Sequence, residues 1–389
     1  MRHCAVLDIG SSKVVCMVVS SDSDGAIIVH GTGVREYSGY RLGELPAKRE
    51  LAETIAGAVH AAERSAKVRI KELCVGVPTP FMEVRLGQGS AEVLSKNGRI
   101  LPADVEELIE SSFDFEPPEG YSLIHSTPVS FVADRTKIHG SPIGLPCGIL
   151  SASVSHCYVD DRFKEAVSSA LESYGMAADS FVSSALASAC FTVPEDIRAS
   201  SVLLVDCGGS HTDISLLRGN AILSCDSVGV GGKHFTSDLC YGLRLPEGVA
   251  EDIKKRYVFS LDYGESCERV RIPGEGVFDI EHSLIQLIIE SRADELCELI
   301  AEKLDHMAEA ETPVWLVGSG LALMRGAKEF VEGRLGRNTA ITMPPVGRNS
   351  SVSFAAAFGL ADFALFRLGH SSAIRRTERY LRRTFDWRT

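Results

Sequence analysis

Two segments of the chain share one layout, and this repeat constrains the fold more than any other feature of the sequence. Residues 5–15 read AVLDIGSSKVV, and residues 201–217 read SVLLVDCGGSHTDISLL. In each segment an apolar, β-branched run reaches an aspartate (Asp8 or Asp206), a turn of small residues follows, and a second apolar run begins. Apolar runs around a Gly/Ser turn predict β-hairpins. The repeat therefore predicts two related halves that open with the same hairpin.

Helical and strand patterns alternate around these hairpins, which predicts an α/β fold. The expected helices are 48–66, 102–110, 162–174, 247–257, 280–307 and 352–368, and the further expected strands are 73–77 and 314–317. Residues 258–276 are expected to form a loop or short strands. Two stretches rich in Gly and Pro, 117–120 and 140–146, interrupt the region from 80 to 160, which we expect to be a small inserted domain.

The two predicted turns have the composition of phosphate-binding loops. Backbone N–H groups of a tight Gly/Ser turn converge on one point and bind anions, and glycine lets the backbone approach a phosphate closely. Asp8 and Asp206 would repel a bound phosphate unless a cation lay between, so they predict Mg²⁺ held through water, because Mg²⁺ dehydrates reluctantly. The residues expected to bind the phosphates are Gly10, Ser11, Ser12, Lys13, Gly208, Gly209, Ser210 and His211.

Composition excludes several other functions. The net charge of −12 argues against a general nucleic-acid coat, because phosphate backbones bind basic surfaces. No apolar run reaches the roughly 18 residues of a membrane-spanning helix, and the acidic Asp8 in the first apolar stretch argues against a secretory signal. The eleven cysteines stand singly and without zinc-site spacing, as expected for free thiols in a reducing cytosol. The sequence contains neither a P-loop nor a GxGxxG motif.

In this order and spacing, three elements resemble the actin-like ATPase superfamily. They are two phosphate motifs at 7–13 and 206–214 and an adenosine motif at 317–320. Within the superfamily the chain is most similar to the FtsA family, which ties FtsZ filaments to the membrane during bacterial cell division. The stretches that carry this closer similarity are 231–239, 250–254 and 288–296, together with the insert at about 84–162 that includes Pro142–Leu145.

The resemblance implies an actin-like fold with two α/β halves around a cleft that binds ATP and Mg²⁺. The further residues that it assigns to nucleotide binding are Gly232, Glu251, Lys254, Gly318, Ser319, Gly320 and Leu321, with 317–320 as the adenosine motif and 250–254 on the adenine side. It also implies a division into subdomains. These are IA (1–83 and 163–197), an FtsA-type inserted IC (84–162), IIA (198–230 and 308–370), IIB (231–307) and a tail (371–389).

The chain departs from the family pattern in ways that bear on the nucleotide. Ser210 and His211 stand where the second phosphate motif usually has Gly and Thr, and His211 is bulky enough to crowd a γ-phosphate. Ser319 stands where the adenosine motif usually has Gly. The helix before the second hairpin, matched to residues 181–190, lacks the carboxylate that positions the attacking water in filament-forming relatives. We therefore expect at most a slow ATPase, with ATP acting as a structural ligand that closes the cleft.

The last residues of the chain break from its acidic character. Residues 373–389 contain six arginines and two acids, and a helical arrangement places Ile374, Leu381 and Phe385 on one face. A basic amphipathic helix with interfacial aromatic residues binds anionic membranes. FtsA also ends in such a helix. The expected membrane-binding residues are Ile374, Arg375, Arg376, Arg379, Leu381, Arg382, Arg383, Phe385 and Trp387.

The sequence therefore favours a cytoplasmic protein, peripheral on the inner face of the cell membrane, that binds the FtsZ C-terminal peptide and self-associates. Its similarity to FtsA leaves polymerisation and the identity of the partner open. Three alternatives remain within the superfamily. One is a PilM-like adaptor of pilus assembly, which shares the insert. The second is a small-molecule kinase, for which Asp179 and Asp213 are the candidate bases. The third is a DnaK-type chaperone, which the missing peptide-binding domain disfavours.

Overall fold

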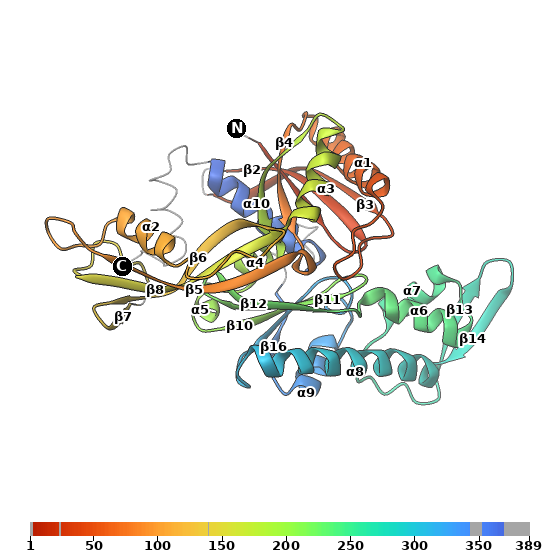
Figure 1. Ribbon diagram of the computed structural model, residues 1–389. Helices are drawn as coiled ribbons and strands as arrows, with labels where there is room; N and C mark the ends of the chain where they lie inside the picture. The colour runs from red at the N-terminus through yellow and green to blue at the C-terminus, as the bar shows by residue number, and fades with distance from the viewer. Residues whose placement is uncertain (1–2, 23–24, 139, 343–351, 369–389) are drawn as a thin grey trace.

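The computed structural model describes residues 3–22, 25–138, 140–342 and 352–368. The predicted membrane-binding residues, from Ile374 to Trp387, lie outside these ranges. Two five-stranded sheets stand at the centre, and one smaller unit extends from them on each side (Figure 1). The chain thus has the two α/β halves expected of an actin-like fold, and the predicted fold class is confirmed.

The first sheet has the strand order β3-β2-β1-β4-β9. Its strands are β1 (Cys4–Ile9), β2 (Lys13–Ser21), β3 (Ile27–Glu36), β4 (Glu72–Val77) and β9 (Ala177–Ser183). The predicted first hairpin is confirmed: β1 and β2 pair antiparallel, with Asp8 opposite Val15. β4 and β9 join in parallel, so the carboxyl ends of β1, β4 and β9 lie at one edge of the sheet.

The second sheet repeats this plan in the order β12-β11-β10-β15-β16. Its strands are β10 (Val202–Cys207), β11 (Thr212–Arg218), β12 (Ala221–Val228), β15 (Val314–Val317) and β16 (Thr339–Ala340). The second predicted hairpin is also confirmed, because β10 and β11 pair antiparallel with Asp206 opposite Asp213. β15 lies parallel to β10, which brings the turn after Val317 beside the turn after Cys207.

Helices cover the sheets on both faces. On the first sheet, α1 (Lys48–Ala66) and α3 (Asp161–Glu172) pack on one face, and α4 (Ser184–Thr192) and α10 (Ala355–Leu368) lie toward the other. On the second sheet, α8 (His282–Met307) and α9 (Ala327–Leu335) pack on the outer face. The short elements are α5 (Glu195–Ala199), η1 (Thr79–Phe81) and η2 (Val352–Phe354).

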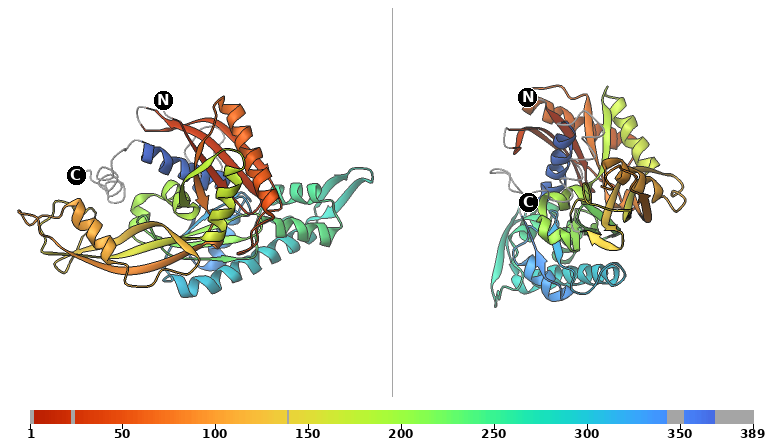
Figure 2. Two further views of the ribbon diagram at one scale, coloured as in Figure 1. Left: turned by 45° about the horizontal axis from the view of Figure 1, so that its top comes forward. Right: turned by 90° about the vertical axis from the view of Figure 1, so that its left-hand side faces the viewer.

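The two smaller units extend in opposite directions (Figures 1 and 2). One is a sheet of order β5-β8-β6-β7 with α2 (Pro102–Ser111) packed against it. Its strands are β5 (Met82–Glu92), β6 (Tyr121–Ala133), β7 (Thr136–Ile138) and β8 (Ile149–Asp160). The other combines α6 (Gly232–Leu243), α7 (Glu247–Arg256), part of α8 and the hairpin β13 (Cys267–Ile272) and β14 (Gly276–Glu281). The exact subdomain boundaries stay predictions.

The expected helices within the described residues form, but several begin elsewhere than expected. α3 begins one residue early, at Asp161, and residues 352–354 form a 3-10 turn before α10 begins at Ala355. Ile280 and Glu281 end β14, so the long helix begins at His282 rather than at 280. The segment 181–190 was expected to be helical throughout, but it is strand as far as Ser183. The Ser183 hydroxyl then accepts a hydrogen bond from the Leu186 N–H at 3.2 Å, so this serine caps α4 and fixes where the helix begins.

Candidate functional site

The two hairpin turns open into one cavity between the halves. Asp8 at the end of β1 and Asp206 near the end of β10 both line it, so the paired aspartates predicted from the sequence lie around one space. Lys13 also lines it. The other predicted residues in its wall are Gly10, Ser11, Ser12, Gly208, Gly209, His211, Gly318 and Ser319.

Backbone geometry holds the turns in place. The Gly10 N–H donates to the Lys13 carbonyl at 2.9 Å, and the Gly208 N–H donates to the His211 carbonyl at 3.0 Å, so the two hairpins close in the same way. Behind them, Gly318 has φ +87°, and a Cβ there would lie 2.3 Å from Asp206 Oδ1 and from the Cys207 carbonyl. Only glycine fits this left-handed position so close to the second turn.

Burial dominates the electrostatics of the cavity. It raises the pKa of Asp8 to about 6, against the opposing charge of Lys13. It raises the pKa of Asp206 to about 7, and repulsion from Asp213 and Asp8 adds to this. Burial lowers the pKa of Lys13, although Asp8 and Asp206 oppose that shift. Two buried carboxylates that repel each other would be stabilised by a cation between them.

His211 is held inside the second turn rather than pointing to solvent. The residue is 4% exposed, and its Nε2 lies 3.3 Å from Asp213 Oδ1. Burial lowers the pKa of His211, but the charges of Asp213 and Asp206 outweigh it, so the net shift is upward. Asp213 also accepts a hydrogen bond from the Ser227 hydroxyl at 2.6 Å. This carboxylate therefore fixes the orientation of the imidazole.

Five further residues predicted to bind the nucleotide do not line this cavity. They are Gly232, Glu251, Lys254, Gly320 and Leu321. Lys254 Nζ lies 2.6 Å from Glu251 Oε2 and donates to the Gly232 carbonyl at 3.1 Å. A Cβ on Gly320 would lie 2.4 Å from the Gly208 carbonyl, and Leu321 is fully buried in the core of the second half. Ser210 is also absent from the wall, because it contacts the first turn directly.

Several residues of the cavity wall were missed from the sequence. They are Ile9, Tyr40, Pro78, Ser184, Asp213 (considered only as a kinase base), Val352, Ser353, Ala355 and Ala356. Two of these residues could have been found from their positions in the sequence. Pro78 follows β4 and Ser184 follows β9, so they stand at the carboxyl ends of parallel strands, where α/β sheets bind ligands. Tyr40 lies in an irregular segment between β3 and α1, and no local pattern marks it.

The residues fit a magnesium-bound phosphate in chemistry but not in space. The wall offers two carboxylates, a lysine and two Gly/Ser turns, which is the donor set that Mg²⁺ and a phosphate take. However, the cavity volume is only about 80 Å³. Pockets for small-molecule ligands usually measure about 300–1,000 Å³. Binding a nucleoside triphosphate would therefore require the turns to separate.

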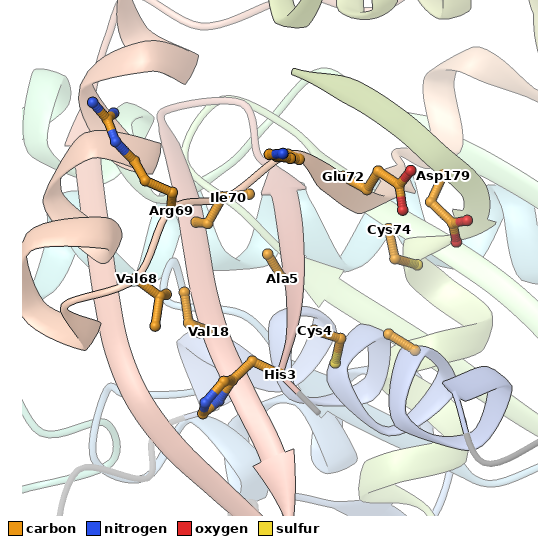
Figure 3. A pocket seen from close by; sticks show the side chains of 12 residues that line it. His3, Cys4, Ala5, Val18, Val68, Arg69, Ile70, Glu72, Cys74 and Asp179 are labelled. Carbon is orange, nitrogen blue, oxygen red and sulfur yellow. The ribbon is translucent and has the colours of Figure 1, made fainter. Parts of the chain in front are cut away.

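A larger cavity of about 640 Å³ lies elsewhere on the first half (Figure 3). His3, Cys4 and Glu72 in its wall stand at the amino ends of β1 and β4, away from the turns. Figure 3 shows the Glu72, Cys74 and Asp179 side chains among those that line this cavity. Asp179, one of the two candidate kinase bases, thus belongs to this cavity and does not line the one between the hairpin turns.

Two kinds of feature are absent from the described part of the chain. None of its helices combines the length and the apolar character needed to cross a bilayer. Among the same residues, no three His, Cys, Asp or Glu side chains form a group that could hold a metal ion.

Comparison with solved structures agrees with the fold. The chain is similar to a PilM–PilN type IV pilus biogenesis complex, with a TM-score of 0.62 at 18% identity over 93% of this chain and 98% of that one. It is also similar to MreB5 of Spiroplasma citri bound to ADP, with a TM-score of 0.56 at 14% identity over 95% and 99%. At these identities the similarity establishes the fold alone.

Sequence comparison finds relatives of one kind. Residues 203–359 match the family "Cell division protein FtsA". FtsA of Pseudomonas aeruginosa is 27% identical over 84% of this chain and 79% of its own length. FtsA of Streptococcus pneumoniae is 24% identical over 92% of this chain and 79% of its own length. Together with the paired hairpins and the two-halved fold, these matches show that the chain is a homologue of the FtsA cell division proteins with an actin-like fold.

Proposed function

We propose that the chain is a nucleotide-binding scaffold that tethers FtsZ filaments to the cytoplasmic face of the cell membrane. The observation that carries this proposal is the pair of hairpin turns from the two halves, which place Asp8, Asp206 and Lys13 around one cavity. A structure of similar fold, MreB5 of Spiroplasma citri, is bound to ADP in one case and to AMPPNP in another. This supports ATP as the ligand of the cleft here, with Asp8 and Asp206 holding Mg²⁺ through water.

The partner site in this proposal is a groove between α6 and α8. Its volume is about 350 Å³, and its wall combines apolar and charged side chains. Tyr241 is 91% exposed and Leu287 is 64% exposed, which is a large apolar surface for a water-facing groove. Arg292 lies beside them and donates to Asp238 at 2.6 Å and 3.0 Å. Such a groove suits a short peptide that carries both apolar and charged residues.

Binding of a labelled FtsZ C-terminal peptide, followed by fluorescence anisotropy, tests this partner. Tyr241→Ser and Leu287→Ser should each weaken binding by about tenfold or more, because exposed aromatic and apolar anchors carry most of the energy at such sites. Leu94→Ser is the matched control, since Leu94 is 82% exposed in the other smaller unit. Equal affinity of all four proteins, or no binding by the unmodified chain, would rule out this groove as the FtsZ site.

The membrane part of the proposal rests on the sequence of the tail. Its arginines would contact anionic headgroups, and Ile374, Leu381 and Phe385 would enter the interface. The segment between Leu368 and Ile374 is short, so the body would be held close to the bilayer. Assembly into filaments or oligomers on this surface would align several copies with one FtsZ filament.

Two other functions stay as second candidates. The fold similarity to the PilM–PilN complex, which covers most of both chains, favours a pilus-assembly adaptor. The arginine-rich tail favours an FtsA-like protein over it. A small-molecule kinase would use Asp213 as its base, since Asp179 lies in the other cavity. Asp213, however, is already engaged by His211 and Ser227.

A further inference from the structure

The two turns contact each other directly. The backbone N–H of Ser210 donates to Ser11 Oγ at 3.1 Å, and the Ser210 hydroxyl donates to the Ser11 carbonyl at 3.3 Å. A Cβ on Gly209 would lie 2.5 Å from Ser12 Oγ, so the backbones pack as closely as glycine allows. Ser11 is buried in this contact. A side-chain oxygen of the first half thus occupies a backbone donor of the second turn, a group suited to bind phosphate.

A second polar link crosses the same boundary. The Tyr40 hydroxyl lies 3.4 Å from His211 Nε2, and the two ring centroids are 5.0 Å apart. Tyr40 belongs to the first half and is 3% exposed, whereas His211 belongs to the second. Behind His211, Asp213 and then Ser227 continue the chain of polar contacts. The link therefore runs from the first half to Ser227 on β12 through a series of polar side chains.

The side chain of Tyr40 packs tightly against other residues of the first half. Its ring packs edge-on against Phe81 at a centroid distance of 5.1 Å, and Phe81 stacks on Phe163. The preceding Gly39 has φ +85°, and a Cβ there would lie 1.7 Å from the Ser11 carbonyl. The segment that carries Tyr40 is thus pressed against the first turn, so both cross-cleft links depend on one local arrangement.

We propose that Ser11, Tyr40 and His211 form a latch across the cleft that determines how fast and how tightly this chain takes up a nucleoside triphosphate. The proposal rests on the nucleotide-binding function proposed above. It adds the residues that limit the rate and the affinity of nucleotide binding. The present cavity of about 80 Å³ is too small for a triphosphate, and in this proposal both links break before the ligand enters. An affinity measured for a site that is open only part of the time is reduced by the open fraction.

The charges in the cleft also favour the closed arrangement over a bound ligand. His211 faces Asp213 and Asp206, which both belong to its own hairpin. Lys13 lies on the first hairpin and faces Asp8 and Asp206. The chain thus supplies two basic groups to its own carboxylates, which lowers the demand for an external cation. Displacing His211 would expose Asp206 and Asp213 to the incoming ligand.

Stopped-flow fluorescence with a mant-labelled ATP analogue and Mg²⁺ tests the latch. Ser11→Ala and Tyr40→Phe each remove one hydroxyl, so each should raise the association rate and the affinity by about two- to tenfold, the equivalent of one hydrogen bond. His211→Ala removes the link and frees space, and should have the larger effect. Tyr174→Phe and His306→Ala, both at exposed positions, are the matched controls and should behave like the unmodified chain.

A second measurement needs no nucleotide. Hydrogen exchange followed by mass spectrometry over the turn at 207–213 should show faster exchange in Ser11→Ala than in the unmodified chain, because the Ser210 amide loses its acceptor. Equal exchange would overturn the closed contact and the latch with it. If all variants bind the analogue at the same rate and affinity, the latch is wrong while the nucleotide site stands. If none binds it, the nucleotide function itself fails.

Discussion

The backbone amide of Ser210 donates a hydrogen bond to Ser11 Oγ at 3.1 Å, and these two residues belong to different halves of the molecule. The halves are therefore joined at the point where the two hairpin turns meet, and not only through their shared core. Because of this contact, the shape of the cleft depends on the conformation of the first turn. Substitutions that shift the first turn should affect both halves.

Gly39 offers a direct test of that dependence. Gly39→Ala should lower the free energy of unfolding by more than about 3 kcal/mol, because a side chain at φ +85° is strained and would also strike the Ser11 carbonyl. Gly43→Ala is the control: it has φ +69° but nothing within 4 Å, so it should cost only about 1 kcal/mol. Urea unfolding followed by circular dichroism measures both. An equal loss of unfolding free energy in both variants would mean that the close packing against Ser11 does not contribute to the cost.

His125 predicts a pH dependence of stability. Both ring nitrogens of this residue on β6 are buried and lack a hydrogen-bond partner within the described residues, although the residue as a whole is partly exposed. Burial lowers its pKa from 6.5 to about 4. Below pH 6.5 the unfolded chain takes up a proton that the folded chain does not, so stability should fall as the pH drops from 6.5 toward 4, by up to about 3 kcal/mol.

The variant His125→Phe should lack this component, so its stability relative to the unmodified chain should rise as the pH falls. Thermal unfolding at pH 7.5, 6 and 5 measures the difference. His306→Phe, at an exposed position on α8, should show no such trend. A constant difference between His125→Phe and the unmodified chain across this range would contradict the proposed burial cost.

The hairpins and the helix pattern could be predicted because they are encoded locally. Asp8 and Asp206 each follow an apolar run and precede a small-residue turn, so the chain itself marks them. Because the two segments share one layout, they also predicted that Asp8 and Asp206 would line the same cavity. The expectation that Gly232, Glu251 and Lys254 would share the cavity depended on the family pattern, and the close packing around Gly320 separates them from it.

The latch could not be predicted, since its partners are distant in sequence. Tyr40 and His211 are 171 residues apart, and Ser11 and Ser210 are 199 apart. His211 stood out as bulkier than the residue expected there, but its side chain could have faced solvent. The packing of Gly39 against Ser11 explains why the Tyr40 side chain is directed at His211.

The tail prediction concerns charge. Replacing Arg375, Arg376, Arg379, Arg382 and Arg383 with Gln keeps the length and the apolar residues but removes most of the attraction to anionic lipid. The variant should sediment with phosphatidylserine vesicles at least about tenfold less than the unmodified chain, since each basic residue contributes about 1 kcal/mol. Neutral vesicles are the control and should bind both proteins weakly. Equal pelleting with the anionic vesicles would mean that the arginines do not anchor the protein.

Turnover of ATP should be slow. The sequence of α4 is SALASACFT, which contains no carboxylate to position an attacking water. The expected rate lies far below the range of about 1–10³ per second that is typical of enzymes. Phosphate release measured over hours, with Asp206→Asn as the background control, gives the rate. Brisk release that Asp206→Asn abolishes would show that another group activates the water.

The most direct test of the nucleotide site is equilibrium dialysis of radiolabelled ATP with Mg²⁺, run long enough for slow uptake to finish. Asp206→Asn keeps the shape of the side chain and removes its charge, and Asp305→Asn on the exposed side of α8 is the matched control. The account predicts that the unmodified chain and Asp305→Asn bind ATP in a magnesium-dependent way and that Asp206→Asn does not. Equal binding by all three proteins would contradict it.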